Sequence, residues 1–348
     1  MNSLNICLLF ITFLFLSSAT VEAQQGKTRA QAVARRYPEL PKVVERRPVT
    51  IWSDGTKMAG DLYMPAKVNA DVKLPVIVFV AGTGGTKKGT AARVAPLFVA
   101  KGYAFLGFDY RGWGESDSKL QILEPMPEPD ERGEVNVRAR AIRWQMDFAD
   151  QVTDIHNAIA FVAGEPKIDA NRIGILGTSY GGGLATWIAA TDTRVRCVAV
   201  QVPGMGGGKR PAAEQRALRL QSQQARGETE PIPFESGVPG GKMSRYAHMR
   251  YNTAKSIGYS VMEAAEAITI PMLIIDAENE ELMDRTENGQ RVAEILEFNG
   301  TTVNYHVLDG ISHYGVYSTK FAEVTSLEID WFDRHLSHSK TTATSSKK

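Results

Sequence analysis

Apolar runs of strand length alternate with helical patterns along most of the chain. The runs at 75–80 and 103–108 show no alternation of apolar and polar residues, which is typical of parallel strands covered on both faces. Further strands are expected at 173–176, 195–202, 270–275 and 302–308. Strands that alternate with helices at such intervals predict an α/β fold with a doubly wound, mostly parallel sheet.

An antiparallel hairpin is expected to open this sheet. Residues 49–52 and 58–63 have the composition of strands, and Asp54-Gly55 between them is a dipeptide typical of tight hairpin turns. Helices are predicted at 91–100, at 148–162, where apolar residues recur at helical spacing, and at 321–336.

Two segments do not fit the alternation of strands and helices. Residues 117–143 form a polar loop with three prolines, and residues 204–259 interrupt the sheet between two strands. Because long irregular insertions in a compact domain are usually lids or binding loops, we expect 204–259 to be a lid-like insertion with a polar helix at 211–226. Ser260 and Glu263 form a capping box that restarts helical structure.

Both ends of the chain differ in composition from the rest. Residues 6–16 are apolar but too few to span a bilayer comfortably, and 21–23 supply a small-residue cleavage pattern. A signal peptide is therefore expected over 1–23, which predicts a secreted or periplasmic protein. An uncleaved anchor is the alternative, because no lysine or arginine precedes the apolar stretch. Residues 24–47 are expected to form a basic N-terminal arm, and 337–348 a disordered polar tail.

Composition narrows the class of protein. The 348 residues include 40 basic and 39 acidic side chains, and 43% are apolar. This balance predicts no nucleic-acid partner and no stable membrane association. The remaining length suffices for one large domain or two small ones, and we expect one large domain over 48–336. Cys197 is the single cysteine after the predicted signal peptide, so we expect a buried structural thiol and no intrachain disulfide.

One short motif carries the chemistry. Gly177-Thr178-Ser179-Tyr180-Gly181 follows the strand at 173–176 and precedes a helix rich in small residues. A serine at the apex of a sharp strand-to-helix turn is the nucleophile elbow of serine hydrolases. The flanking glycines leave room for the tight turn, and the N-terminus of the helix favours developing negative charge. Ser179 is the predicted nucleophile.

A nucleophilic serine needs a base. The six histidines are His156, His248, His306, His313, His335 and His338. His313 lies in a loop directly after a predicted strand and before the last helix, and such carboxyl-end loops converge on the ligand crevice of an open α/β sheet. His313 is therefore the predicted base, and His248, in the insertion, is a distant alternative.

The third member of a triad is a carboxylate that orients the imidazole. Five acidic residues lie between 276 and 284, after one strand. Here the chain resembles the α/β-hydrolase superfamily, in particular its dienelactone-hydrolase-like and Xaa-Pro-peptidase-like esterases, whose strand ends in P-x-L-x-I-x-G-x-x-D. The resemblance places Ala277 at the glycine and Glu280 at the acid, with Asp276 and Asp284 as alternatives. The order serine, acid, histidine along the chain agrees with this superfamily.

The same resemblance implies an oxyanion hole made of main-chain donors. Tyr180 follows the nucleophile and is one expected donor. Residues 81–86 stand where relatives show H-G-x-G-G, which makes Thr83 the second. A phosphate-binding loop is the alternative for this glycine-rich segment, but no Gly-Lys-Ser/Thr signature follows it. Residues 109–116 resemble the D-x-R-G-x-G-x-S turn of these relatives and are expected to be scaffolding, with Trp113 a candidate pocket wall.

We therefore expect a secreted serine hydrolase that cleaves carboxylic esters through an acyl-enzyme and needs no cofactor or metal. Its substrate would be a small-molecule or polymer-linked ester. A serine peptidase of the Xaa-Pro or prolyl type is the nearest alternative, since G-x-S-Y-G-G also occurs there. A non-catalytic binding protein that keeps the fold is the third.

Overall fold

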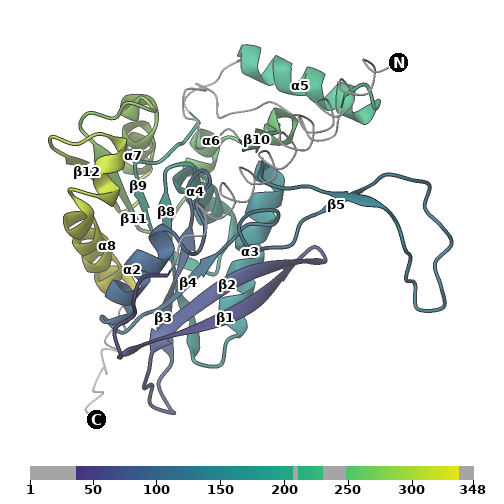
Figure 1. Cartoon of the computed structure of the whole chain (residues 1–348). Coiled ribbons are helices and arrows are strands. Elements are labelled where there is room, and N and C mark those ends of the chain that lie inside the picture. Colours follow the sequence, from purple (N-terminus) through teal and green to yellow (C-terminus); the bar gives the residue numbers. More distant parts are fainter. Residues whose placement is uncertain (1–36, 207–210, 230–247, 337–348) are drawn as a thin grey trace, which may run out of the picture. The chain divides into compact units, whose positions relative to one another are not determined.

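The computed structural model describes residues 37–206, 211–229 and 248–336 (Figure 1). The predicted signal peptide at 1–23, the predicted tail and most of the predicted arm therefore lie outside the described residues. The chain divides into two compact units, 1–38 and 39–348, and every helix and strand described below belongs to the second.

The centre of the second unit is an eight-stranded sheet with the strand order β1-β2-β4-β3-β8-β9-β11-β12. Its strands are β1 (Val44–Ser53), β2 (Thr56–Pro65), β3 (Leu74–Val80), β4 (Ala104–Phe108), β8 (Ile168–Thr178), β9 (Val195–Gln201), β11 (Met272–Ala277) and β12 (Val303–Leu308). β2 pairs antiparallel with β1 and β4, and all other neighbours in the sheet are parallel. The expected doubly wound, mostly parallel sheet with an antiparallel hairpin at its start is confirmed.

Helices connect these strands. They are α2 (Thr90–Val99), α3 (Phe148–Gly164), α4 (Tyr180–Thr191), α5 (Pro211–Ala225), α6 (Val261–Ala265), α7 (Gly289–Phe298) and α8 (Phe321–Leu336). Short 3₁₀ turns lie at Thr253–Ser256, Arg285–Glu287 and His313–Tyr317. Ser260 caps α6 by accepting a hydrogen bond from the backbone N–H of Glu263, as expected from the capping box.

Two glycines of β8 show how helices cover both faces of the sheet. A Cβ atom on Gly174 would lie 2.7 Å from the ring of Phe332 in α8, and one on Gly177 would lie 2.6 Å from Ala185 in α4. Residues three apart in a strand point to opposite faces. α8 and α4 therefore pack on opposite faces, and each approaches the sheet closely where a side chain is missing.

Several boundaries differ from those expected. β1 begins at Val44, within the segment predicted as an arm. The strand expected at 270–275 extends to Ala277, so Asp276 is part of β11. The predicted loop at 117–143 contains a small antiparallel ribbon of β5 (Leu120–Ile122) and β6 (Ala139–Ala141). The other small sheet pairs β7 (Gln145–Met146) with β10 (Arg250–Tyr251). The predicted insertion at 204–259 is described only in part, and α5 is its polar helix.

Two predicted roles are settled by burial. Trp113 is fully buried, and its indole N–H donates to the backbone carbonyl of Gln145 at 2.8 Å. Its ring packs between those of Tyr110 and Trp144. Trp113 is thus part of the core rather than a pocket wall. Cys197 is a buried free thiol, as expected, and burial raises its pKa.

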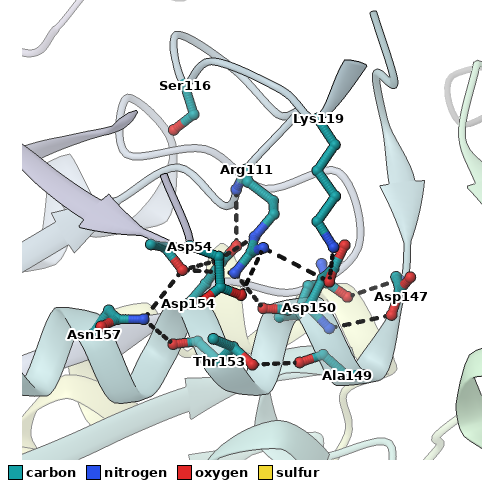
Figure 2. Close-up of polar contacts among 12 residues, drawn as sticks. Asp54, Arg111, Ser116, Lys119, Asp147, Ala149, Asp150, Thr153, Asp154 and Asn157 are labelled. Carbon is teal, nitrogen blue, oxygen red and sulfur yellow. Dashed lines mark hydrogen bonds and ion pairs between the residues drawn. The ribbon is translucent and has the colours of Figure 1, made fainter. Parts of the chain in front are cut away.

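A buried ion pair fastens the turn after β4 to α3 and to the first hairpin (Figure 2). The Arg111 guanidinium donates through Nε to Asp154 at 2.6 Å and through Nη2 to the Ser53 hydroxyl at 2.6 Å. The backbone N–H of Arg111 donates to the second carboxylate oxygen of Asp154. Burial raises the pKa of Asp154, and the adjacent guanidinium opposes that effect. At its rim, Lys119 pairs with Asp150.

Removing one partner of this buried pair should destabilise the protein strongly. Asp154→Ala leaves the Arg111 guanidinium with only its longer contacts to Asp54 and Asp150, at 3.3 and 3.7 Å, and breaking such a buried pair typically costs about 3–5 kcal/mol. The half-exposed ion pair of Lys119 supplies the control, because Lys119→Met should cost less than about 1 kcal/mol. Urea denaturation followed by circular dichroism measures both changes. Equal losses in the two variants would show that Arg111 and Asp154 do not anchor the turn.

Glu328 generates a second prediction, on the pH dependence of stability. It lies on the buried side of α8, and its Oε1 has no hydrogen-bond partner among the described residues. Burial raises the pKa of Glu328 from 4.5 to about 8. Between these values the folded state keeps a proton that the unfolded state releases, so this carboxyl lowers stability progressively as pH rises from 4.5 to about 8.

Glu328→Gln removes the titration. We expect the free energy of unfolding of this variant, relative to the original protein, to increase from pH 5 to pH 8 and not beyond. Glu323→Gln, on the same helix and exposed, should follow the pH profile of the original protein. Urea denaturation at several pH values measures the difference, and a constant offset between the Glu328 variant and the original protein would contradict the prediction.

Candidate active site

Ser179 occupies a strained turn between β8 and α4. Its φ is 52° and its ψ is −126°, in a region that side-chain-bearing residues rarely adopt. Position 181 requires glycine, because a Cβ atom there would lie 2.3 Å from the backbone oxygen of Val80. Two backbone hydrogen bonds hold Ser179 to β9 and to the segment that follows it. The Ser179 N–H donates to the carbonyl of Gln201 at 2.9 Å, and the Ser179 carbonyl accepts from the N–H of Gly204 at 2.9 Å.

The structure brings the three predicted triad residues together. Nε2 of His313 lies 3.1 Å from Oγ of Ser179, and Nδ1 of the same ring lies 2.9 Å from each carboxylate oxygen of Glu280. The side chains of His313 and Glu280 are only 2% and 3% exposed. With the proton of the neutral ring assigned to Nδ1, which faces the carboxylate, Nε2 is left to accept from the serine hydroxyl.

Two further glutamates hold the histidine loop in place. Glu281 accepts a hydrogen bond from the backbone N–H of His313 at 2.7 Å, and Glu278 accepts one from Gly310 at 2.7 Å. The backbone N–H of Asn279 donates to the carbonyl of Ile311. The sequence analysis did not predict these two roles, because it looked only for the acid of the triad. The number of acidic residues in this segment could have indicated them, since a triad needs only one carboxylate.

The two alternative acids lie elsewhere. Asp276 is buried within β11, and one of its oxygens has no hydrogen-bond partner among the described residues. Burial raises its pKa to about 7. Asp284 is exposed and caps the turn Arg285–Glu287 by accepting from Thr286. No hydrogen bond joins either carboxylate to His313 in the described part of the chain, so the geometry singles out Glu280.

The other described histidines have different surroundings. His156 lies 2.8 Å from Asp192, and the ring of His335 packs on Trp331 at 4.2 Å. The ring of His248 packs against that of Trp144, and His306 is part of β12. His338 lies outside the described residues. The base expected from topology is thus the histidine that the structure brings to Ser179.

The two segments that carry the predicted oxyanion donors lie at the same serine. Tyr180 is the first residue of α4, where backbone N–H groups have no partner within the helix. A Cβ on Gly82 would lie 3.0 Å from Cβ of Ser179, so the loop after β3 lies against the elbow, and Thr83 is its next residue. The Tyr180 hydroxyl donates to Oε1 of Gln151 at 2.5 Å, which fixes this residue from its other end.

Aromatic side chains gather beside the elbow. The ring of Phe148 lies 5.3 Å from that of Tyr180 and stacks on that of Tyr259 at 4.1 Å. Trp187 of α4 packs on the other side of Tyr259, with ring centroids 4.8 Å apart. The rings of Tyr251 and Phe148 form a T-shaped pair, with centroids 6.5 Å apart. This cluster offers apolar surface next to Ser179.

The described ranges hold neither a cluster of metal-binding side chains nor a membrane-spanning helix. Within 37–206, 211–229 and 248–336, no three or more histidine, cysteine or acidic side chains are grouped so that they could hold a metal ion. No helix in these ranges is both long and apolar enough to cross a membrane.

Known proteins resemble this chain in sequence. A quorum-quenching protein, AidA, of Acinetobacter baumannii is 35% identical over 155 residues, which are 44% of this chain and 43% of AidA. An uncharacterized 31.7 kDa protein of Escherichia coli is 26% identical over 291 residues, 76% of this chain and 93% of that protein. Thiohydrolase aneE of Aspergillus aculeatus is 30% identical over 145 residues, 42% of this chain and 37% of the enzyme. The chain thus spans less than half the length of AidA.

Solved structures share the fold. A hypothetical protein of Pseudomonas aeruginosa superposes with a TM-score of 0.60 at 20% identity, covering 86% of this chain and 97% of that one. The α/β hydrolase GrgF of Penicillium sp. superposes with a TM-score of 0.61 at 18% identity, covering 84% of this chain and 99% of that one. At such identities the likeness extends to the fold alone.

Family models match the part of the chain that builds the site. The model of the BAAT / acyl-CoA thioester hydrolase C-terminal region matches residues 155–314. The model described as X-Pro dipeptidyl-peptidase (S15 family) matches residues 54–229, just over half of the 348 residues and including the elbow. The chain therefore belongs to the X-Pro dipeptidyl-peptidase (S15) family, and it has the fold of the α/β hydrolase GrgF.

Proposed function

We propose that the protein is a serine hydrolase that cleaves carboxylic esters through an acyl-enzyme. Ser179 is the nucleophile, His313 the general base and Glu280 the acid of the triad. One observation carries the proposal, the continuous chain of hydrogen bonds from the serine hydroxyl through both ring nitrogens to a buried carboxylate.

The geometry supports one role for each group in the proposed reaction. As Oγ of Ser179 attacks the acyl carbon, Nε2 of His313 takes its proton, and Glu280 stabilises the resulting imidazolium. The backbone N–H groups of Tyr180 and Thr83 receive the negative charge that develops on the carbonyl oxygen. The imidazolium then protonates the departing alkoxide, and a water activated by the same ring releases the acid.

An acyl substrate with an apolar part suits the surroundings. The aromatic cluster of Phe148, Tyr180, Tyr251 and Tyr259 beside the elbow can bury such a group. Relatives carry the names thiohydrolase and acyltransferase, which denote chemistry at acyl groups. Ester leaving groups also depart more easily than amines. We also propose that the protein is secreted, and the support for this is the signal-peptide pattern at residues 1–23 of the sequence.

A dipeptidyl peptidase is the second candidate, because the matching family model bears that name. Such an enzyme needs a group that binds the terminal ammonium of the peptide. The carboxylates on either side of the triad acid, those of Glu278 and Glu281, already accept hydrogen bonds from the histidine loop. These bonds give both carboxylates a structural role, and the preference for the ester rests on the aromatic cluster beside the elbow.

Substitutions in the triad should produce unequal losses. Ser179→Ala and His313→Ala should each lower kcat on p-nitrophenyl acetate by roughly 10⁵- to 10⁶-fold, because the members act as a unit. Glu280→Gln should lose less than either. A fluorophosphonate probe should label the original protein and not Ser179→Ala. A well-folded protein that takes no label would favour a non-catalytic binding protein.

Two matched variants control this series. Glu281→Gln keeps an oxygen acceptor for the backbone of His313, and Asp276→Asn changes a buried carboxyl that does not contact the ring. Each should retain activity within about 10-fold of the original, far above Glu280→Gln. Greater damage from Asp276→Asn than from Glu280→Gln would show that the acid is misassigned.

A separate measurement distinguishes ester from peptide substrates. One preparation is assayed with p-nitrophenyl esters of increasing acyl length and with dipeptidyl anilides that carry proline. We expect kcat/KM for the best ester to exceed that for the best anilide by at least about 100-fold, or roughly 3 kcal/mol of transition-state stabilisation. Comparable turnover of an anilide that requires a free amino terminus would favour the peptidase.

A further inference from the structure

A hydrogen bond joins the turn that begins at His313 to the strand that leads to Ser179. The hydroxyls of Tyr317 and Thr178 share this bond, with their oxygens 2.5 Å apart. Thr178 is the last residue of β8 and directly precedes Ser179, whereas Tyr317 ends the 3₁₀ turn of His313. The two residues are 139 positions apart in the sequence, so the bond forms only when the two segments meet in the folded chain.

The fold directs both side chains to the same face of the sheet. Gly174 of β8 faces Phe332 of α8, and Thr178 points to that face too, because side chains alternate along a strand. The 3₁₀ turn that ends at Tyr317 leads into α8, which begins at Phe321. Thr178 is only 3% exposed, so its hydroxyl needs a partner inside the protein, and the Tyr317 hydroxyl is that partner.

The turn between His313 and Tyr317 is too closely packed to bend freely. A Cβ atom on Gly315 would lie 2.4 Å from Cβ of Ile311. The carbonyl of Tyr317 accepts a hydrogen bond from Nη1 of Arg93 in α2 at 3.1 Å. Because close-packed segments transmit a displacement, a shift of Tyr317 moves His313 with it.

The bonds on the other side of His313 fix a different distance. The carboxylates after β11 hold its ring and its backbone, which sets the imidazole relative to the acid. They do not set it relative to Ser179, because β9 lies between β11 and β8. The bond from Tyr317 to Thr178 spans this separation and ends one residue before Ser179.

We propose that Tyr317 and Thr178 are positioning residues of the hydrolase. Their hydrogen bond sets the distance between Nε2 of His313 and Oγ of Ser179. The inference rests on the proposed function, because it concerns the approach of the base to the nucleophile in that reaction. Neither hydroxyl takes part in the proton transfer. When the bond is lost, the acid and the base stay together and both move away from Ser179.

The first test is structural and needs no substrate. In a crystal structure of Tyr317→Phe, we expect the distance from Nε2 of His313 to Oγ of Ser179 to increase from 3.1 Å to beyond about 3.5 Å, outside hydrogen-bond reach. The distance from Nδ1 to the carboxylate of Glu280 should stay at 2.9 Å. Thr178→Val removes the same bond from its other end and should give the same displacement. Unchanged distances in both variants would overturn the proposal.

The second test measures the consequence for the reaction. Tyr317→Phe and Thr178→Val should each lower kcat on p-nitrophenyl acetate by about 10- to 100-fold and leave KM within about 2-fold, because the reacting atoms are misplaced while substrate binding is intact. The double variant should lose no more than the more damaged single variant, since both changes remove one bond. Thr178→Ser keeps the hydroxyl and should keep kcat within about 3-fold of the original protein.

Tyr103→Phe is the matched control. The hydroxyl of Tyr103 donates to Asp333 of α8 at 2.8 Å, so this variant also loses a tyrosine hydrogen bond but leaves the turn at His313 untouched. Its kcat should stay within about 2-fold of the original, and circular dichroism checks that every variant is folded. A loss of kcat in Tyr103→Phe as large as that in Tyr317→Phe would show general destabilisation and overturn the positioning role.

The two proposals fail in different ways. If hydrolysis requires Ser179 and both Tyr317→Phe and Thr178→Val keep full kcat, the serine hydrolase stands and the positioning role is wrong. If Ser179→Ala keeps the activity of the original protein, the proposed function is wrong. The crystal structures of the two variants still decide, in that case, whether the bond sets the distance from His313 to Ser179.

Discussion

The structure depends on the close packing around one turn, the elbow at Ser179. The serine has a φ of 52°, and the glycine at 181 passes within van der Waals reach of the backbone of Val80. A side chain at 181 would push α4 away from β3 and change where the helix begins. The positions of the nucleophile, of the first N–H groups of α4 and of the loop after β3 are therefore set by the same steric contact.

The sheet then brings the remaining groups to that turn. β8 lies between β3 and β9, and β11 and β12 follow on one side, all parallel. Parallel strands end at the same edge, so loops that leave β8, β11 and β12 meet there although Ser179 and His313 lie 134 residues apart. The site therefore forms where the carboxyl ends of these strands meet. The buried Arg111–Asp154 pair holds the turn after β4 against α3.

Local patterns made much of this predictable. The elbow is contiguous in sequence, and His313 was recognised by its place after a strand and before the last helix. Glu280 came from a strand-end motif. What sequence could not reveal depends on side chains distant along the chain. The roles of Glu281 toward the backbone of His313, and of Asp154 toward Arg111, arise from pairings that leave no periodic trace. The burial of Trp113 could not be predicted for a similar reason. A tryptophan next to a site motif can face either a pocket or the core, and the local sequence does not distinguish the two.

The bonds from Glu278, Asn279 and Glu281 to the histidine loop have a mechanical consequence. They join the acid and the base into a single body, whereas the nucleophile is carried by a separate strand and helix. Thermal displacement of the β11–β12 edge would then change the gap between Nε2 and Oγ while leaving the imidazole–carboxylate distance intact. In the proposed triad the acid and the base are therefore preassembled, and the distance that can vary is the one from Nε2 of His313 to Oγ of Ser179.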